Sequence, residues 1–296
     1  MNIGMIGLGA MGLPMAKNLA KAGMKVYGYN RTSEKPRQEL ARCGGMICAS
    51  ISEAVQEADA VLSSLPNSQV VEDTMLGRDG VLASCPTGCC IVDLSSVSPA
   101  TSRKIGKAAK EKGVLYADAP VSGGTGGAEK GTLTIMFGGE KETWKKVQPV
   151  LKVLGSRLIY VGDIGSGDAV KLVNNLLLGC NMAAVAEALS LGKELGLSEE
   201  VMKEIIGSSS GNSYVFQAKM DGFILPGQFE GGFATELQYK DLNLALDAAK
   251  EALVPLPMTA AASQIYAASR SLGNGRKDIS SVIQLWQTIR KERKDE

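Results

Sequence analysis

The sequence contains no histidine among its 296 residues. This absence removes the residue that most often transfers protons in enzymes, together with serine–histidine and cysteine–histidine nucleophile systems and histidine metal sites. Any proton transfer by this chain must therefore use lysine, aspartate, glutamate, tyrosine or cysteine. Cysteine is scarce as well: there are six and no C-x-x-C pair, which predicts reduced thiols that mainly contribute to packing.

An excess of one charge sign is also missing. The chain carries 32 Lys and Arg against 31 Asp and Glu, so it lacks the basic surplus that binding to a phosphate backbone requires, and nucleic acid is not an expected partner. No charged segment followed by an apolar run precedes the first predicted strand, and asparagines and a glutamate interrupt the most apolar run, 172–191. We therefore expect a cytoplasmic protein without a signal peptide or a membrane partner.

Short apolar runs alternate with helical periods over the first half of the chain. These runs predict strands at residues 2–6, 25–29, 60–65, 89–94, 114–117, 133–137 and 158–161. Strands that alternate with helices favour an α/β domain, in which a mainly parallel sheet is covered by helices.

The pattern changes near residue 165. A helical period runs from Asp168 to about Leu195, and helices are also expected at 199–206, 234–252, 258–271 and 278–290. The first of these reaches roughly 40 Å and is apolar on more than one face, so its own domain or a second subunit should bury it. We expect an α/β domain over 1–164, joined by this long helix to an all-helical domain over 165–296.

The first predicted strand runs directly into a G-x-G-x-x-G turn and an amphipathic helix. In such a turn the first glycine permits a tight bend, the second lets backbone approach a pyrophosphate, and the third lets helix pack on strand. The helix N-terminus adds free N–H groups and a partial positive charge. The first domain is therefore predicted to be a Rossmann dinucleotide-binding domain, whose turn consists of Gly7, Leu8, Gly9, Ala10, Met11 and Gly12.

The second predicted strand ends at Asn30-Arg31-Thr32, about eighteen residues beyond the turn, where a Rossmann domain discriminates between riboses. An acidic residue here would bind both ribose hydroxyls and repel a 2′-phosphate, whereas this chain offers an amide, a guanidinium and a hydroxyl. The expected cofactor is NADP(H), with NAD as the alternative. Arg31 alone could favour NADPH by roughly ten- to a hundredfold, unless it is a solvated loop residue.

Three further residues follow predicted strands at the edge where ligands of such sheets bind. Leu65 and Pro66 follow the strand at 60–65, and Ser96 follows the strand at 89–94. We expect them on the cofactor side, with Ser96 near the nicotinamide and Ser98 as a candidate helix cap.

The segment Asp118-Ala-Pro-Val-Ser-Gly-Gly124 follows another predicted strand. Consecutive glycines allow backbone N–H groups to converge on an anion, and Ser122 adds a hydroxyl, so Ser122, Gly123 and Gly124 suit a substrate carboxylate. The alternative is a flexible surface loop.

Lys171 lies in the first turns of the long predicted helix. Asn175, four residues later, shares its face. A helical lysine is usually solvated, but here the positive end of the helix dipole and partial burial both disfavour the charged form. Lys171 can then exchange a proton with a hydroxyl group, a task that histidine often performs. A third cluster, from Phe233 to Lys240 and Asp241, has by its spacing the pattern of an ordinary amphipathic surface.

Taken together, these segments resemble the β-hydroxyacid dehydrogenase family, which includes 3-hydroxyisobutyrate dehydrogenases and glyoxylate/succinic semialdehyde reductases. The resemblance covers essentially the whole chain and rests on the segments 6–15, 118–124, 165–175 and 240–242. The run 167–182 is especially similar to the 2-(hydroxymethyl)glutarate dehydrogenases, which implies a dicarboxylic or similar anionic semialdehyde.

The resemblance also implies site residues. Lys171 would be the catalytic lysine, and Lys240 would close over the cofactor. Substrate would contact Ser122, Gly123, Gly124, Asn175, Phe233 and Asp241. A homodimer or homotetramer and a small carboxylate substrate are implied as partners, and no metal is expected.

The expected reaction is reversible hydride transfer between NADP(H) and a short hydroxy acid or semialdehyde. Three alternatives stay open. One is oxidation with decarboxylation, as in 6-phosphogluconate dehydrogenases, although no sugar-phosphate cluster is evident. Another is imine reduction on the same architecture, where the lysine position typically differs. The third is a non-catalytic dinucleotide-binding protein.

Overall fold

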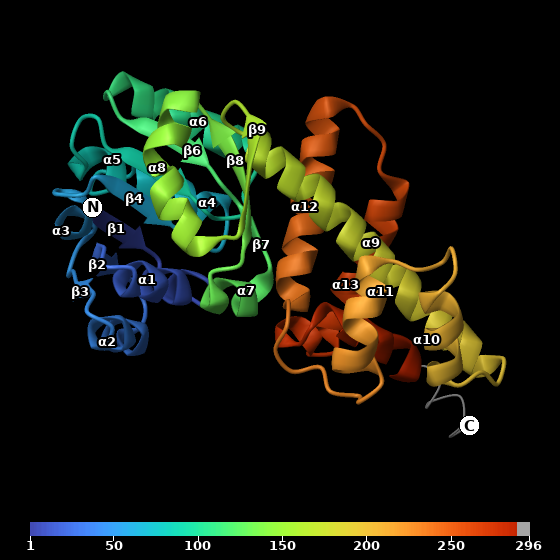
Figure 1. Cartoon of the computed structure of the whole chain (residues 1–296). Coiled ribbons are helices and arrows are strands. Elements are labelled where there is room, and N and C mark those ends of the chain that lie inside the picture. Colours follow the sequence, from blue (N-terminus) through green and yellow to red (C-terminus); the bar gives the residue numbers. More distant parts are fainter. Residues whose placement is uncertain (289–296) are drawn as a thin grey trace. The chain divides into compact units, whose positions relative to one another are not determined.

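The computed structural model describes residues 1–288, and the chain in it forms two compact units, Met1–Lys171 (unit 1) and Leu172–Glu296 (unit 2) (Figure 1). Helix α9, Ser166–Glu194, contributes residues to both. Unit 1 holds a mostly parallel sheet and unit 2 is mostly helical, which confirms the α/β fold predicted from the sequence.

A nine-stranded sheet forms unit 1, in the order β3-β2-β1-β4-β5-β6-β8-β7, with β9 beside β8. Its strands are β1 Asn2–Ile6, β2 Lys25–Tyr29, β3 Met46–Ile47, β4 Ala60–Ser63, β5 Cys90–Asp93, β6 Leu115–Asp118, β7 Val121–Ser122, β8 Thr134–Gly139 and β9 Arg157–Gly162. The neighbouring strands β3, β2, β1, β4, β5 and β6 run parallel to one another. Strand β8 runs antiparallel to β6 and β7. The sequence predicted seven of these strands but not the two-residue strands β3 and β7.

The parallel strands end together at one edge of the sheet. Ile6 pairs with Ser63, Ser63 with Asp93, and Asp93 with Asp118, so β1, β4, β5 and β6 terminate in register. The strand order reverses between β1 and β4, and ligands of such sheets bind beyond the carboxyl ends of the strands at this reversal. The predicted cofactor and carboxylate segments all follow these ends.

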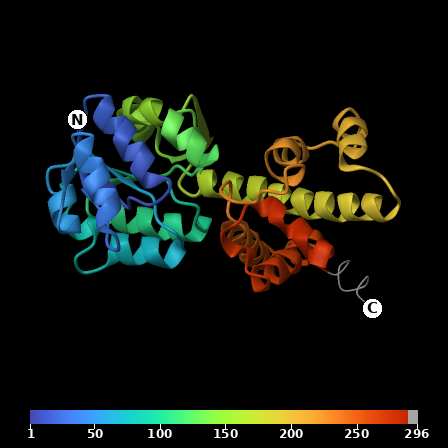
Figure 2. The ribbon, with the colours of Figure 1, turned by 90° about the horizontal axis from the view of Figure 1, so that it is seen from below.

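Helices cover both faces of the sheet in unit 1, as Figure 2 shows edge-on. One buried cluster packs α1, α7 and α8 on the sheet, and a second packs α3 to α6 on the opposite face. The helices are α1 Gly12–Lys21, α2 Glu34–Arg42, α3 Ile51–Val55, α4 Ser68–Leu76, α5 Val81–Ser84, α6 Pro99–Glu111, α7 Gly124–Lys130 and α8 Lys141–Leu154. Ser98 caps α6, as its position suggested: its Oγ accepts the Thr101 N–H at 3.1 Å.

Unit 2 is built around α9, which contributes fully buried residues such as Met182 and Leu189 to its core. The other helices are α10 Glu199–Gly207, α11 Tyr214–Lys219, α12 Thr235–Ala252 and α13 Pro257–Ser271, with a π-helical segment Met220–Ile224 and 3₁₀ segments Asn274–Arg276 and Ile279–Ile283. The helix expected at 278–290 thus begins as a 3₁₀ turn, because Asp278 is extended and caps it. Residues 289 and 290 lie outside the described part.

By length and composition, α9 is the one helix among the described residues that could cross a membrane. The core helix of a globular unit has the same properties. Met182, Ala186 and Leu189 are fully buried among side chains of unit 2, so part of the apolar surface of α9 lies in a core.

Candidate active site

The glycine turn of unit 1 has the geometry that a bound dinucleotide requires. Gly7 has a φ of +93°, and a Cβ there would lie 2.3 Å from the carbonyl oxygen of Ser64. A Cβ on Gly12 would lie 2.0 Å from the carbonyl oxygen of Gly7, whereas a Cβ on Gly9 would meet nothing within 4 Å. The first and third glycines therefore serve close packing, and the second leaves the backbone open to a phosphate. The turn fits a nicotinamide dinucleotide.

Asn30 connects the end of β2 to this turn. Its Oδ1 accepts the N–H of Leu8 at 3.2 Å, and its carbonyl oxygen accepts two N–H groups of Arg37, at 3.0 and 2.5 Å. Arg31 and Thr32 are exposed beside it. Asn30 therefore holds the glycine turn against the segment 30–32, which is predicted to lie near the ribose. Arg37, which sequence reasoning missed, fixes the backbone of that segment. The available signal was a second arginine six positions beyond Arg31, in the first turn of the helix that follows.

Hydrogen bonds join the loops after β4 and β5, which carry residues predicted to lie on the cofactor side. The Oγ of Ser95 accepts the N–H of Leu65 at 2.8 Å and donates to Asp93 Oδ1 at 2.6 Å. Pro66 is exposed and Ser96 is half-buried. Ser95 thus positions the loop that carries Leu65 and Pro66, while Ser96 stays the predicted ligand of this stretch.

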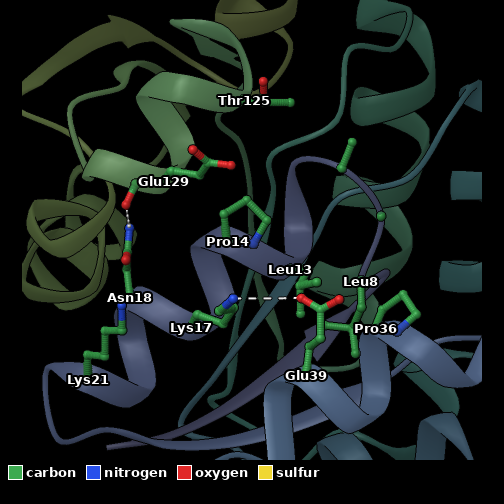
Figure 3. Close-up of a pocket in the computed structure, with 12 residues that line it drawn as sticks. Leu8, Leu13, Pro14, Lys17, Asn18, Lys21, Pro36, Glu39, Thr125 and Glu129 are labelled. Atoms are coloured by element: carbon green, nitrogen blue, oxygen red, sulfur yellow. Dashed lines mark hydrogen bonds and ion pairs between the residues drawn. The ribbon is translucent and has the colours of Figure 1, made fainter. Parts of the chain in front are cut away.

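An open cavity of about 620 Å³ adjoins the glycine turn in unit 1 (Figure 3). Leu8, Gly9 and Ala10 of the turn form part of its wall, and α1, α2 and α7 form the rest. Lys17 and Glu39 make an ion pair at its edge, with 3.7 Å between Nζ and Oε2. None of the residues predicted to act on substrate lines it, so this cavity belongs to the surroundings of the phosphate turn.

The predicted carboxylate segment begins at the last residue of β6. Ser122 is half-buried in β7 and pairs with Thr134 of β8. Gly123 and Gly124 are exposed, with φ values of +133° and +62°, conformations that favour glycine. Two successive left-handed residues turn the chain sharply from β7 into α7, so this segment has a defined backbone within unit 1.

Lys171 lies on α9, whose start is bound to the same segment. Asp118 Oδ1 accepts the N–H of Gly165 at 2.6 Å, and Oδ2 accepts the N–H of Asp168 at 2.8 Å. Lys171 follows Asp168 by three residues and is only 9% exposed. The structure therefore places the lysine on a buried face of α9, one helical turn beyond the residues bound by Asp118. Its burial agrees with the partial burial that the sequence predicted.

Two buried carboxyl groups flank this helix start. Burial raises the pKa of Asp118 from 3.8 to about 6, against the lowering effect of its N–H partners. Burial also raises the pKa of Asp168 well above its ordinary value, and the charge of Asp118 adds to the rise. The Oγ of Ser102 donates to Asp168 Oδ2 at 2.6 Å. The two carboxyl groups therefore share a site in which two negative charges are unfavourable.

Polar side chains also gather inside unit 2. The Asn175 amide donates to Asp241 Oδ2 at 2.5 Å, and the Gln238 amide donates to the Asn175 carbonyl at 2.8 Å. Lys240 Nζ lies 3.2 Å from Asp241 Oδ1. Gln238 and Asp241 are 0% and 3% exposed, so the prediction of an ordinary amphipathic surface was wrong for this face of α12. Tertiary packing against α9 supplies their partners, and helical spacing alone cannot show it.

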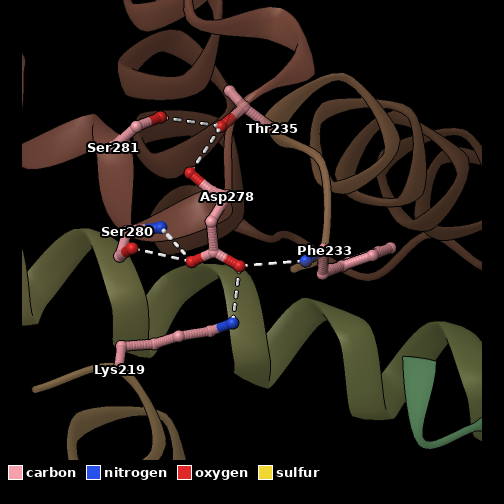
Figure 4. Close-up of polar contacts among 6 residues, drawn as sticks. All are labelled: Lys219, Phe233, Thr235, Asp278, Ser280 and Ser281. Atoms are coloured by element: carbon pink, nitrogen blue, oxygen red, sulfur yellow. Dashed lines mark hydrogen bonds and ion pairs between the residues drawn. The ribbon is translucent and has the colours of Figure 1, made fainter. Parts of the chain in front are cut away.

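The segment that leads into α12 is held by a buried aspartate (Figure 4). Asp278 is 0% exposed. Its Oδ2 accepts the N–H of Phe233 at 2.9 Å and contacts Lys219 Nζ at 2.6 Å, and its Oδ1 accepts the Ser280 hydroxyl at 2.7 Å. Asp278 thus fixes the backbone at Phe233. Sequence reasoning missed it, because its partners are far away in the chain.

The predicted residues form two groups. Unit 1 brings together the glycine turn, Asn30, the Leu65 loop, and the segments that carry Ser122 and Lys171, all at or beyond the carboxyl edge of the sheet. Unit 2 brings together Asn175, Lys240 and Asp241. Their assignment as site residues stays a prediction.

The glycine turn and the Rossmann sheet define a dinucleotide-binding α/β protein. Residues 2–162 match the family model described as the NAD binding domain of 6-phosphogluconate dehydrogenase. Residues 165–286 match the model described as NAD-binding of NADP-dependent 3-hydroxyisobutyrate dehydrogenase. The chain belongs to the 3-hydroxyisobutyrate dehydrogenase family and is an NAD(P)-dependent hydroxyacid dehydrogenase, which confirms the family and enzyme class predicted from the sequence.

Individual relatives agree over nearly the full length. The chain is 54% identical to 2-(hydroxymethyl)glutarate dehydrogenase of Eubacterium barkeri, over 97% of this chain and 95% of that one. It is 38% identical to an NAD-dependent L-serine dehydrogenase of Pseudomonas aeruginosa, over 96% and 97%. The solved 3-hydroxyisobutyrate dehydrogenase of Mycobacterium tuberculosis with L-serine superposes with a TM-score of 0.88 at 34% identity, over 96% and 98%. The non-catalytic alternative is thereby set aside.

Proposed function

We propose that this dehydrogenase uses NADP(H) to interconvert a short hydroxy acid and its semialdehyde, with Lys171 as general acid and base. The observation that carries the proposal is the burial of Lys171, at 9% exposure, on a helix whose start is bound to the segment of Ser122. A buried lysine in a chain without histidine is the available proton carrier at this place.

The proposed division of labour follows from the residues. The bound nicotinamide supplies or accepts the hydride at its C4 atom. In reduction, the Lys171 ammonium donates its proton to the developing alkoxide oxygen. In oxidation, the neutral Lys171 amine accepts the proton of the substrate hydroxyl, so that the carbonyl forms as the hydride leaves carbon.

Substrate and cofactor residues are assigned by the family resemblance. We propose that Ser122 and the amides of Gly123 and Gly124 bind the substrate carboxylate, because the glycine backbone there is exposed and left-handed. Asn175, Phe233 and Asp241 are proposed to contact substrate as well. Lys240 is proposed to reach the cofactor. We further propose that the second domain, 165–296, serves substrate binding and subunit assembly.

The preference for NADP(H) is proposed from Arg31. The names of similar proteins differ on this point, since one matching family model is called NADP-dependent and the L-serine dehydrogenase NAD-dependent. Exchange of Arg31 for Met should lower the ratio of kcat/KM for NADPH over NADH by roughly ten- to a hundredfold. The control is Arg42→Met, which changes an exposed arginine at the end of α2. An NADH preference in the unaltered enzyme would contradict the proposal.

The proposed substrate is a dicarboxylic or similarly anionic hydroxy acid, supported by the 54% identity to 2-(hydroxymethyl)glutarate dehydrogenase. Oxidation of 2-(hydroxymethyl)glutarate, 3-hydroxyisobutyrate and L-serine should be compared with NADP⁺ and NAD⁺, following reduced nicotinamide by absorbance. We expect the highest kcat/KM for the first. If the enzyme oxidised none of the three compounds, the proposed function would be contradicted. Release of CO₂ would favour the decarboxylating alternative.

We also propose a homodimer or homotetramer. Val173, Leu177 and Leu191 on α9 are 61%, 55% and 62% exposed, an apolar surface that a second copy of the chain would cover. Light scattering should give at least twice the monomer mass of 31.0 kDa, and a monomer at micromolar concentration would refute this. A cytoplasmic location stays a prediction from the sequence.

A further inference from the structure

Asp118 joins the two segments of unit 1 that are proposed to act on substrate. It is the last residue of β6 and precedes Ser122 by four positions. Its two carboxylate oxygens accept the N–H groups of Gly165 and Asp168, at 2.6 and 2.8 Å. These donors belong to the start of α9, where N–H groups have no partner within the helix. One side chain therefore binds the helix of Lys171 to the segment of Ser122.

The space around this carboxylate leaves little freedom for movement. A Cβ on Gly138, which pairs with Asp118 in the sheet, would lie 2.7 and 2.8 Å from the two carboxylate oxygens. A Cβ on Gly167 would lie 2.2 Å from the carbonyl oxygen of Met136. A side chain at either position would force a shift of these neighbours, so the first turn of α9 packs directly on β8 and on Asp118.

Lys171 lies one turn beyond the residues that Asp118 binds. The direction of its side chain is set by the rotation and tilt of the helix at 165–168, because Cα–Cβ bonds are fixed to the helix backbone. A displacement of about 1 Å at a reacting group can reduce the rate by about a hundredfold. The two hydrogen bonds of Asp118 therefore act on the place where the lysine amine lies.

We propose that Asp118 is a positioning residue, which holds the first turn of α9 so that Lys171 keeps a fixed place relative to the Ser122 segment. This inference rests on the proposed role of Lys171 as general acid and base. Asp118 itself touches neither substrate nor cofactor in this account. Its effect on catalysis is transmitted through the lysine.

A double-mutant cycle tests this transmission. Asp118→Asn keeps the shape of the side chain but retains one acceptor oxygen and places an amide against an N–H donor. It should lower kcat at least about tenfold, with the KM for substrate and the Kd for NADPH within about twofold. In a Lys171→Ala enzyme, the same exchange should change the residual kcat by less than about twofold. The control is Asp163→Asn, an exposed aspartate just before α9, which should behave as the unaltered enzyme.

The outcomes separate this inference from the proposed function. If Asp118→Asn lowers kcat by the same factor with and without Lys171, Asp118 has a general structural role and the inference fails. A normal kcat in Asp118→Asn would overturn it as well. If Lys171→Ala alone retains near-normal turnover, the proposed function fails instead.

A second variant covers the case in which Asp118→Asn does not fold. Gly138→Ala retains the Asp118 side chain but puts a methyl group less than 3 Å from both of its carboxylate oxygens. The resulting shift should displace the start of α9. Circular dichroism and NADPH binding establish that each variant is folded. The same loss of kcat, and the same lack of effect without Lys171, are expected for Gly138→Ala, and equal losses in both backgrounds would overturn the inference.

Discussion

Two buried aspartates, Asp118 in unit 1 and Asp278 in unit 2, hold the starts of functional segments in different ways. Asp278 contacts the ammonium of Lys219 at 2.6 Å and accepts further hydrogen bonds. The bonds that the structure gives Asp118 come from backbone N–H groups, and a second carboxyl group, that of Asp168, lies beside it. Asp278 thus has a cation as partner, whereas burial raises the pKa of Asp118 into the range in which its charge changes with pH.

The largest expected effect comes from removal of the Asp278 carboxylate. Asp278→Ala leaves Lys219, whose side chain is 13% exposed, without its counter-charge and the Phe233 N–H without its acceptor. The free energy of unfolding should fall by about 3–5 kcal/mol, as for other buried pairs. Denaturant unfolding measures it. The control Asp247→Ala removes an exposed pair with Lys250, with side chains 68% and 78% exposed, and should cost less than about 1 kcal/mol. Equal losses of unfolding free energy in the two variants would show that the buried pair stabilises the protein no more than the exposed one.

A smaller effect should appear in the pH dependence of stability, at the site in unit 1. Burial raises the pKa of Asp118 to about 6 and also raises the pKa of Asp168, whereas an unfolded aspartate releases its proton near pH 3.8. The folded state therefore binds more protons over this interval, and the unfolding free energy contributed by the pair should decrease as pH rises from about 4 to about 6, by on the order of 2 kcal/mol.

Asp168→Asn tests the origin of this decrease. It removes the second carboxyl group and keeps an oxygen for the Ser102 hydroxyl, so the decrease between pH 4 and pH 6 should become smaller than in the unaltered protein. Chemical unfolding at several pH values measures it, and Asp163→Asn should leave the slope unchanged. A slope that is unaffected by Asp168→Asn would show that the carboxyl pair is not its source.

The smallest effect distinguishes two serines with similar bonds. Ser280 donates at 2.7 Å to Asp278, whose other oxygen contacts the Lys219 ammonium, and Ser102 donates to the Asp168 carboxyl at 2.6 Å. Hydrogen bonds to charged groups contribute about 1.5–3 kcal/mol, and neutral ones about 0.5–1.5 kcal/mol. At about pH 5, where the Asp118 and Asp168 pair is expected to hold a proton, Ser280→Ala should therefore destabilise more than Ser102→Ala, by about 1 kcal/mol in thermal or denaturant unfolding. The reverse order would mean that Asp168 is the charged group.

The sequence predicts those features whose causes are local. The glycine pattern of the turn is contained in residues 7–12, and the tight contact of Gly12 is made with Gly7 in the turn itself, whereas that of Gly7 is made with Ser64 after β4. Helical spacing likewise predicts Lys171 and Asn175 on one face of a long helix. Strands longer than three residues are predicted by their apolar runs, whereas β3 and β7, with two residues each, are too short for any period to show.

The supports of the site depend on partners that are distant in the chain. Asp118 binds N–H groups 47 and 50 residues away, and Asp278 contacts Lys219 across 59 positions. Gln238 and Asp241 looked like surface residues because helical spacing does not show that α9 covers them. Antiparallel pairing of β8 is a long-range property of the same kind. Composition and spacing therefore yield the predicted site residues, and the structure shows the contacts that hold their segments.

The central claim is that Lys171 transfers the proton in this reaction. The most direct measurement is the kcat of Lys171→Ala with the best substrate and NADP(H), together with the Kd for NADPH from nucleotide fluorescence. The account predicts a kcat at least about a hundredfold lower and a Kd within about twofold of the unaltered enzyme. Near-normal turnover in a folded Lys171→Ala enzyme that binds NADPH would contradict it.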